Sequence, residues 1–170
     1  MFIENKILTE GNMAKSLVAY FSASGITAKV ARNLSEVTGA DLYEIKPAQP
    51  YTDKDLNWMD QNARSTVEMN DKSFRPPIVK DNPHIEKYDT IFVGFPIWWY
   101  VAPTIINTFL EAHDFSDKKI VLFATSGGSG FGGTVDNLRP SVADSTEIIQ
   151  GKILNHNPSK DVLKEWVESL

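Results

Sequence analysis

The sequence predicts an α/β fold: a doubly wound, five-stranded parallel sheet with helices on both faces. Residues 17–21, 90–95 and 119–124 are apolar almost throughout, as are strands that are buried on both faces of a parallel sheet. Segments with apolar residues at helical spacing follow these runs, and strand and helix patterns alternate five times along the chain. Such alternation is typical of βαβ units.

The N-terminal part of this fold is expected to contain one helix between two strands. The helix follows residues 17–21, buries Val30, Ala31 and Leu34, and ends at Gly39. Residues 41–45 then alternate between polar and apolar side chains, which predicts a strand at the edge of the sheet.

A long polar segment, residues 51–83, connects this edge strand to the next one, and we call it the crossover segment. Thr52 is a suitable N-cap for a helix, and a rough apolar stripe follows it at Leu56, Met59, Ala63 and Val67. The favoured role for this segment is to cover one face of the sheet, and the alternative is a lid that touches a ligand.

The C-terminal half repeats the strand and helix pattern three times. We expect strands at 90–95, 119–124 and 146–149, a helix after Pro103, a short helix limited by Pro140, and a last helix capped by Ser159. The apolar residues of these helices are Ile105, Ile106, Phe109 and Leu110, then Val135 and Leu138, then Val162, Leu163, Trp166, Val167 and Leu170.

Length and composition limit the number of domains and the classes of function that are open to this chain. With 170 residues, of which 42% are hydrophobic, we expect residues 13–170 to form a single domain and residues 1–12 an appended N-terminal extension. The net charge of −5 argues against nucleic acid as a partner. The absence of cysteine excludes disulfides and thiolate chemistry. Neither a signal peptide nor a membrane-spanning run is evident, so a cytoplasmic protein without a membrane partner is expected.

The loop at residues 22–27, which we call the hydroxyl loop, joins the first strand to its helix. Ser22, Ser24 and Thr27 supply hydroxyl donors, and Gly25 allows close approach. The free N–H groups and the dipole at a helix N-terminus favour an anion, so the loop predicts a phosphate site. The alternative is a turn that only caps its helix.

The kind of phosphate follows from what the hydroxyl loop lacks. No Lys follows Gly25, as it would in the P-loop of ATP and GTP enzymes, and no G-x-G-x-x-G pattern is present for a dinucleotide. A single phosphomonoester therefore fits this loop best.

The residues around this loop resemble the flavodoxin signature, and the likeness extends over residues 13–170. The matching positions are Val18, Tyr20, Ser22, Gly25, Thr27, Ala31 and Leu34, whereas Ala19 departs from the signature. The resemblance implies that the hydroxyl loop holds the phosphate of FMN. It also implies the strand order 2-1-3-4-5, which brings the loops after strands one, three and four to one rim.

The loops after strands three and four offer the two kinds of group that bind an isoalloxazine ring: aromatic side chains in the first and unshielded main-chain groups in the second. An aromatic ring system is bound by stacking, and its polar edge needs main-chain partners. Either loop alone could instead be a core plug or a flexible turn. The predicted FMN-binding residues are Ser22, Ser24, Gly25, Ile26 and Thr27, then Pro96, Ile97, Trp98, Trp99 and Tyr100 (the aromatic loop), then Thr125, Ser126, Gly127, Gly128 and Gly132 (in the glycine loop, residues 125–134).

This chain lacks the catalytic or ligand residues of other families that share the expected fold. Small tyrosine phosphatases need a Cys nucleophile, and response regulators need an Asp where this chain has Gly94-Phe95-Pro96. A cobalamin module would have a His in the first loop, and this chain has none there.

Two functions, and a weaker third, remain open. The flavodoxin resemblance implies an electron carrier that docks a reductase and acceptor proteins as a monomer or weak dimer. Residues 95–100 also look like a loop of FMN- or FAD-dependent NAD(P)H:quinone oxidoreductases. The third function is a flavin-binding module with a sensing or storage role. One departure weakens the carrier hypothesis, because flavodoxins usually have a glycine after strand three and Ile97 to Ala102 contains none.

Overall fold

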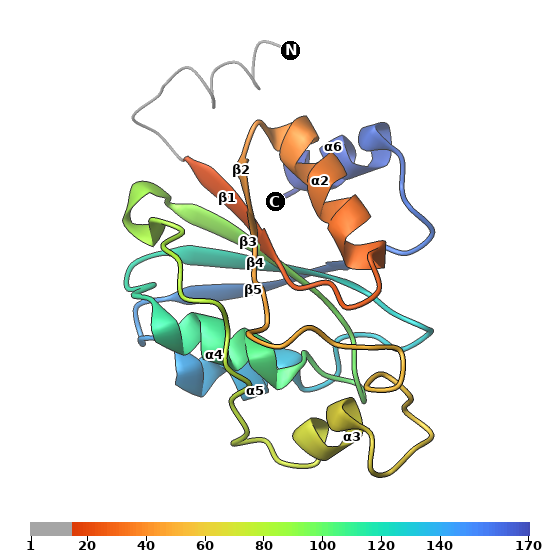
Figure 1. The fold of residues 1–170 in the computed structure, drawn as a ribbon. Helices are drawn as coiled ribbons and strands as arrows, with labels where there is room; N and C mark the ends of the chain where they lie inside the picture. Colours follow the sequence, from red (N-terminus) through yellow and green to blue (C-terminus); the bar gives the residue numbers. More distant parts are fainter. Residues whose placement is uncertain (1–14) are drawn as a thin grey trace.

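The computed structural model describes residues 15–170 and shows one parallel sheet with the strand order β2-β1-β3-β4-β5 (Figure 1). The fold class and the strand order predicted from the sequence are both confirmed. The expected extension at residues 1–12 lies outside the described residues. The strands are β1 (Ser16–Tyr20), β2 (Asp41–Glu44), β3 (Thr90–Pro96), β4 (Lys119–Thr125) and β5 (Glu147–Ile153).

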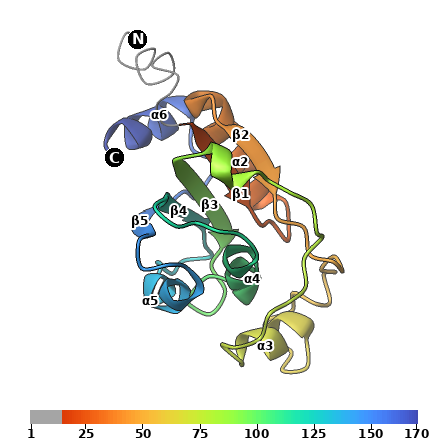
Figure 2. The ribbon, with the colours of Figure 1, turned by 90° about the vertical axis from the view of Figure 1, so that its left-hand side faces the viewer.

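Helices cover both faces of the sheet (Figures 1 and 2). Alternate strand residues belong to the core on one face or the other. Leu17 and Ala19 of β1 face the pair α4 and α5, whereas Val18 and Tyr20 face α2 and α6. Every residue from Leu17 to Tyr20 is buried, which explains the uninterrupted apolar run. These helices are α2 (Ile26–Thr38), α4 (Thr104–Ala112), α5 (Thr134–Leu138) and α6 (Lys160–Glu168), and a 3₁₀ turn, η2 (Arg139–Ser141), follows α5.

The predicted ends of α2 and α6 are confirmed at Gly39 and Ser159. Gly39 follows α2 in the left-handed conformation, with φ of 71°, which is the usual C-terminal cap. The Ser159 side chain accepts a hydrogen bond from the N–H of Val162 and caps α6. On α6 the predicted buried face was too wide, because Val162 is 44% and Leu170 is 53% exposed.

Strand β5 is longer than predicted and reaches Ile153 instead of ending at residue 149. As an edge strand it exposes Gln150, so its second half lacks an apolar run. Gly151 lies beside a bulge in the pairing with β4, where a side chain would collide with the carbonyl oxygen of Leu122. The sequence pattern missed this half because a half-exposed strand has a mixed composition.

The crossover segment differs most from its prediction. Thr52 and Asp55 close a single turn, and the helix α3 spans only Arg64–Met69. The side chains of Asn57 and Asp60 accept hydrogen bonds from main-chain N–H groups two residues later, and such local bonds compete with helix formation. Figure 2 shows α3 apart from both helix layers, so it does not cover the sheet, and a short 3₁₀ turn, η1 (Ile85–Lys87), leads into β3. The predicted stripe was also wrong, because Met59 is 70% and Val67 is 50% exposed.

No helix in residues 15–170 is long and apolar enough to cross a membrane.

Gly94 in the centre of the sheet provides a test of this packing. A Cβ atom at this position would overlap the ring of Phe123 on the neighbouring strand. Gly94→Ala should therefore lower the free energy of unfolding by ~1–3 kcal/mol, measured by urea denaturation. Gly130→Ala is the control, because nothing lies within 4 Å of a Cβ there, and equal stability of the two variants would contradict this packing.

Candidate functional site

Three loops meet at the carboxyl ends of β1, β3 and β4, and hydrogen bonds join them. The Thr27 and Thr125 hydroxyls lie 2.8 Å apart and link the hydroxyl loop to the glycine loop. The N–H of Ile97 donates to the carbonyl of Thr125 at 2.8 Å, and the N–H of Ala102 donates to the Thr134 hydroxyl at 3.1 Å. The predicted convergence of the three loops on one rim is thus present in the structure.

The hydroxyl loop leaves the start of α2 open. Gly25 has φ of 94°, and its N–H donates to the Ser22 hydroxyl at 3.1 Å. No side chain of the described residues caps α2, and Ser24 is exposed beside its first turn. Thr27 differs from Ser22 and Ser24, because it is 2% exposed and its hydroxyl is hydrogen-bonded to that of Thr125. An anion at this end of α2 would meet main-chain N–H groups and serine hydroxyls.

The aromatic loop forms a tight two-residue hairpin. Trp98 and Val101 exchange two main-chain hydrogen bonds of 2.9 and 3.1 Å, and Trp99 and Tyr100 between them have φ of 49° and 69°. Two positive φ values are typical of a type I′ turn, which usually contains Asn and Gly. Larger residues in this conformation cost about 1–2 kcal/mol each, and such strain often accompanies a functional site.

Trp98 and its two neighbours on this turn have different surroundings. The half-buried Trp98 ring packs edge to face on Phe21, with centroids 5.6 Å apart, and on Tyr51 at 5.4 Å. Trp99 is 39% and Tyr100 is 70% exposed. Trp98 is therefore fixed by the core, while the other two rings project from the turn tip.

The glycine loop is held by specific hydrogen bonds. The Ser126 hydroxyl accepts from the N–H groups of Gly128 at 3.1 Å and Ser129 at 2.9 Å. The N–H of Ser126 in turn donates to the Asn155 side chain at 2.8 Å. Gly132 has φ of 52° and lies so close to the Tyr100 carbonyl that any side chain would collide with it. These contacts argue against a loose turn, and the contribution of Asn155 was not foreseen from the sequence.

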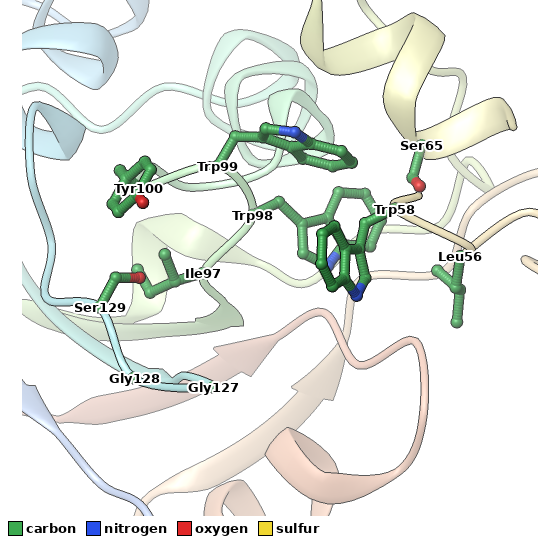
Figure 3. A pocket seen from close by; sticks show the side chains of 10 residues that line it. All are labelled: Leu56, Trp58, Ser65, Ile97, Trp98, Trp99, Tyr100, Gly127, Gly128 and Ser129. Carbon is green, nitrogen blue, oxygen red and sulfur yellow. The ribbon is translucent and has the colours of Figure 1, made fainter. Parts of the chain in front are cut away.

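A cavity of about 620 Å³, which we call the aromatic cavity, opens between these loops (Figure 3). Its predicted lining residues are Ile97, Trp98, Trp99, Tyr100, Gly127 and Gly128. The other predicted residues do not line it: Ser22, Ser24, Gly25, Ile26 and Thr27 form the adjacent hydroxyl loop, and Pro96, Thr125, Ser126 and Gly132 support the loops around the cavity.

The crossover segment supplies lining residues that the sequence did not predict, namely Leu56, Trp58 and Ser65. The favoured interpretation of this segment as a cover for the sheet holds only in part: Tyr51 and Ile78 pack against the core, whereas Leu56, Trp58 and Ser65 lie at the candidate site. A tryptophan within an otherwise polar stretch was the only signal in the sequence.

A partly buried ionic cluster, Tyr51, Arg64 and Glu68, fastens α3 to the cavity wall. The Tyr51 hydroxyl donates to the Glu68 carboxylate at 2.5 Å, and Arg64 Nε donates to the other Glu68 oxygen at 2.9 Å. The Arg64 guanidinium also lies 3.8 Å from the centre of the Tyr51 ring. Burial of the phenol, followed by its bond to Glu68, raises the pKa of Tyr51 well above its usual value, so the phenol stays a donor at neutral pH.

The family follows from comparison with known proteins. The model of the flavodoxin family matches residues 15–170. The chain belongs to the flavodoxin family. The resemblance inferred from the sequence is confirmed, and no curated protein sequence matches the chain.

Three solved structures resemble this flavodoxin-family chain. A protein described as a flavoprotein, from Bacteroides eggerthii DSM 20697, has 44% identity and a TM-score of 0.84, over 92% of this chain and 97% of its own. One from Bacteroides uniformis ATCC 8492 has 42% identity and a TM-score of 0.85, over 91% and 98%. A flavoprotein in complex with FMN from Lactobacillus acidophilus NCFM has 25% identity and a TM-score of 0.66, over 91% and 99%.

The ionic cluster can be tested by removing one oxygen atom. Tyr51→Phe deletes the donor to the buried Glu68 carboxylate and should lower the free energy of unfolding by ~1–3 kcal/mol. Because the pKa of Tyr51 is raised in the folded state, this contribution is fully present below the unfolded value near pH ~10 and is lost above it.

The matched control is Tyr100→Phe, since that side chain is 70% exposed. Urea unfolding of both variants at pH 7 measures the difference. Identical midpoints for the two variants would show that the Tyr51 hydroxyl contributes nothing to stability.

Proposed function

We propose that this chain binds FMN and carries electrons between a reductase and acceptor proteins. The observation that carries the proposal is one rim on which an open helix N-terminus adjoins an aromatic-lined cavity. FMN, the cofactor predicted from the sequence, is confirmed by membership of the flavodoxin family and by the similar flavoprotein in complex with FMN.

The residues present fit FMN. Ser22, Ser24 and the first N–H groups of α2 would hold its phosphate, since these groups are donors at the positive end of a helix. The aromatic cavity would hold its ring system between aromatic side chains and the main chain of Gly127 and Gly128. Bound FMN supplies the redox chemistry, and the protein binds it, orients it and excludes water.

Two observations favour a carrier over an enzyme that takes hydride directly. A nicotinamide must stack on an open face of the flavin, and the bulky rings of Trp98 and Trp99 line the cavity where that face would lie. The net charge of −5 suits docking on basic partner proteins. The redox partners, the state as a monomer or weak dimer and the cytoplasmic location remain predictions.

An FMN-dependent NAD(P)H:quinone oxidoreductase is the second candidate. It is favoured by residues 95–100, which resemble the corresponding loop of such enzymes.

The phosphate site can be tested with two ligands that differ only in the phosphate. Replacing both Ser22 and Ser24 by Ala should weaken FMN on the order of tenfold or more, because charge-assisted hydrogen bonds are lost. Riboflavin should bind both proteins equally well. Thr27 is left unchanged because its hydroxyl holds the loops together. Titrations followed by flavin fluorescence give the two Kd values, and equal weakening of both ligands would place the phosphate elsewhere.

The carrier hypothesis predicts that NAD(P)H alone reduces the FMN-loaded protein poorly. Adding a ferredoxin-type reductase in catalytic amount should accelerate reduction strongly, because that enzyme accepts the hydride and passes electrons on. An anaerobic titration followed by flavin absorbance distinguishes the two functions. Rapid bleaching by NADH or NADPH alone, with turnover on a quinone, would favour the oxidoreductase.

A further inference from the structure

Trp58 is an exposed aromatic side chain at the wall of the aromatic cavity. It is 71% exposed and projects from the crossover segment, far in sequence from the loops that carry the flavodoxin signature. Figure 3 shows its ring in the cavity region together with Trp98 and Trp99. Among the described residues, no ring contact or hydrogen bond of this side chain is present, so its indole is available to a ligand.

The main chain around Trp58 is nevertheless held in place. The N–H of Ser65 donates to the Asp55 carbonyl at 3.0 Å, and Arg64 donates to the Gln49 carbonyl at 2.7 Å. The turn at Asn57, described above, shapes the chain on the other side of Trp58. A free side chain on a fixed main chain is suited to pack on a ligand without ordering a whole loop.

The ionic cluster connects this segment to the opposite part of the cavity. Tyr51 contacts the Trp98 ring at 5.4 Å and also binds Glu68 of α3. Ser65, which is 1% exposed, lines the cavity, and Figure 3 shows its hydroxyl directed from α3 toward the cavity side. That hydroxyl has no hydrogen-bond partner among the described residues, which is unusual for a buried polar atom.

We propose that Trp58 is a flavin-binding residue that packs on the ring system of FMN from the crossover segment, and that this cover limits access of small hydride donors. The inference rests on the proposed function, because it needs FMN in the aromatic cavity. Burying an exposed indole against a planar ring is favourable. When Trp58 covers the flavin ring, small hydride donors are kept away from it. Electrons are then exchanged only with proteins that dock at the rim of the cavity, as a carrier requires.

The test compares Trp58→Ala with Met59→Ala in the FMN-loaded protein. Met59 is 70% exposed, next in sequence, and does not line the cavity, so its variant controls for a change on this turn. Trp58→Ala should weaken FMN and riboflavin alike, by about tenfold, because the lost contact is with the ring. Its bound flavin should also be less quenched in fluorescence, whereas Met59→Ala should match the parent protein in both measurements.

A second measurement tests the shielding. NADH should reduce the Trp58→Ala protein several-fold faster than the parent protein, and Trp58→Phe should restore slow reduction because a ring again covers the flavin. Urea midpoints equal to that of the parent show that the variants are folded.

Each contrary result has a distinct meaning. Binding and quenching unchanged in Trp58→Ala would overturn the contact, and unchanged reduction by NADH would overturn the shielding. A parent protein that binds no FMN would overturn the proposed function itself, and this inference with it.

Discussion

The reversal of the sheet connections between β1 and β3 determines where the hydroxyl loop and the aromatic loop lie. From β1 the chain passes through α2 on one face, and from β3 it passes through α4 on the other, although the two strands are paired neighbours. Loops that leave adjacent parallel strands toward opposite faces diverge and leave a crevice. The bond between Thr27 and Thr125, 98 residues apart, fastens the rim of this crevice.

Hydrogen bonds and close packing hold the loops of the rim against one another. The hairpin at Trp99 and Tyr100 adopts an unfavourable conformation for large residues, and its two main-chain bonds and the packing of Trp98 on the core compensate that cost. Gly132 must be a glycine because the Tyr100 carbonyl occupies the space of a side chain. The glycine loop and the aromatic loop therefore fit each other, which keeps both in place before a ligand arrives.

The sequence predicted the elements that are buried to the same degree along their whole length. Residues 17–21 are buried on both faces, so hydrophobicity alone identified the strand. The second half of β5 is half exposed, and it was missed. The helix expected after Thr52 failed because Asn57 and Asp60 bind their own main chain instead. The bond of the Thr27 hydroxyl to Thr125 and the place of Trp58 beside the aromatic loop depend on how distant segments come together, which no local pattern encodes.

Access to the ring system, rather than the fold, distinguishes a carrier from an oxidoreductase in this architecture. The family accounts for the sheet, the hydroxyl loop and FMN, and each of these would serve either function equally well. The two functions differ only in whether a nicotinamide can stack on the flavin. We propose that in this chain Trp58 and the aromatic loop decide that property. The Tyr51, Glu68 and Arg64 cluster joins these two parts of the cavity wall. On this proposal the signature residues specify which cofactor binds, and the crossover segment sets which electron donors can reach it.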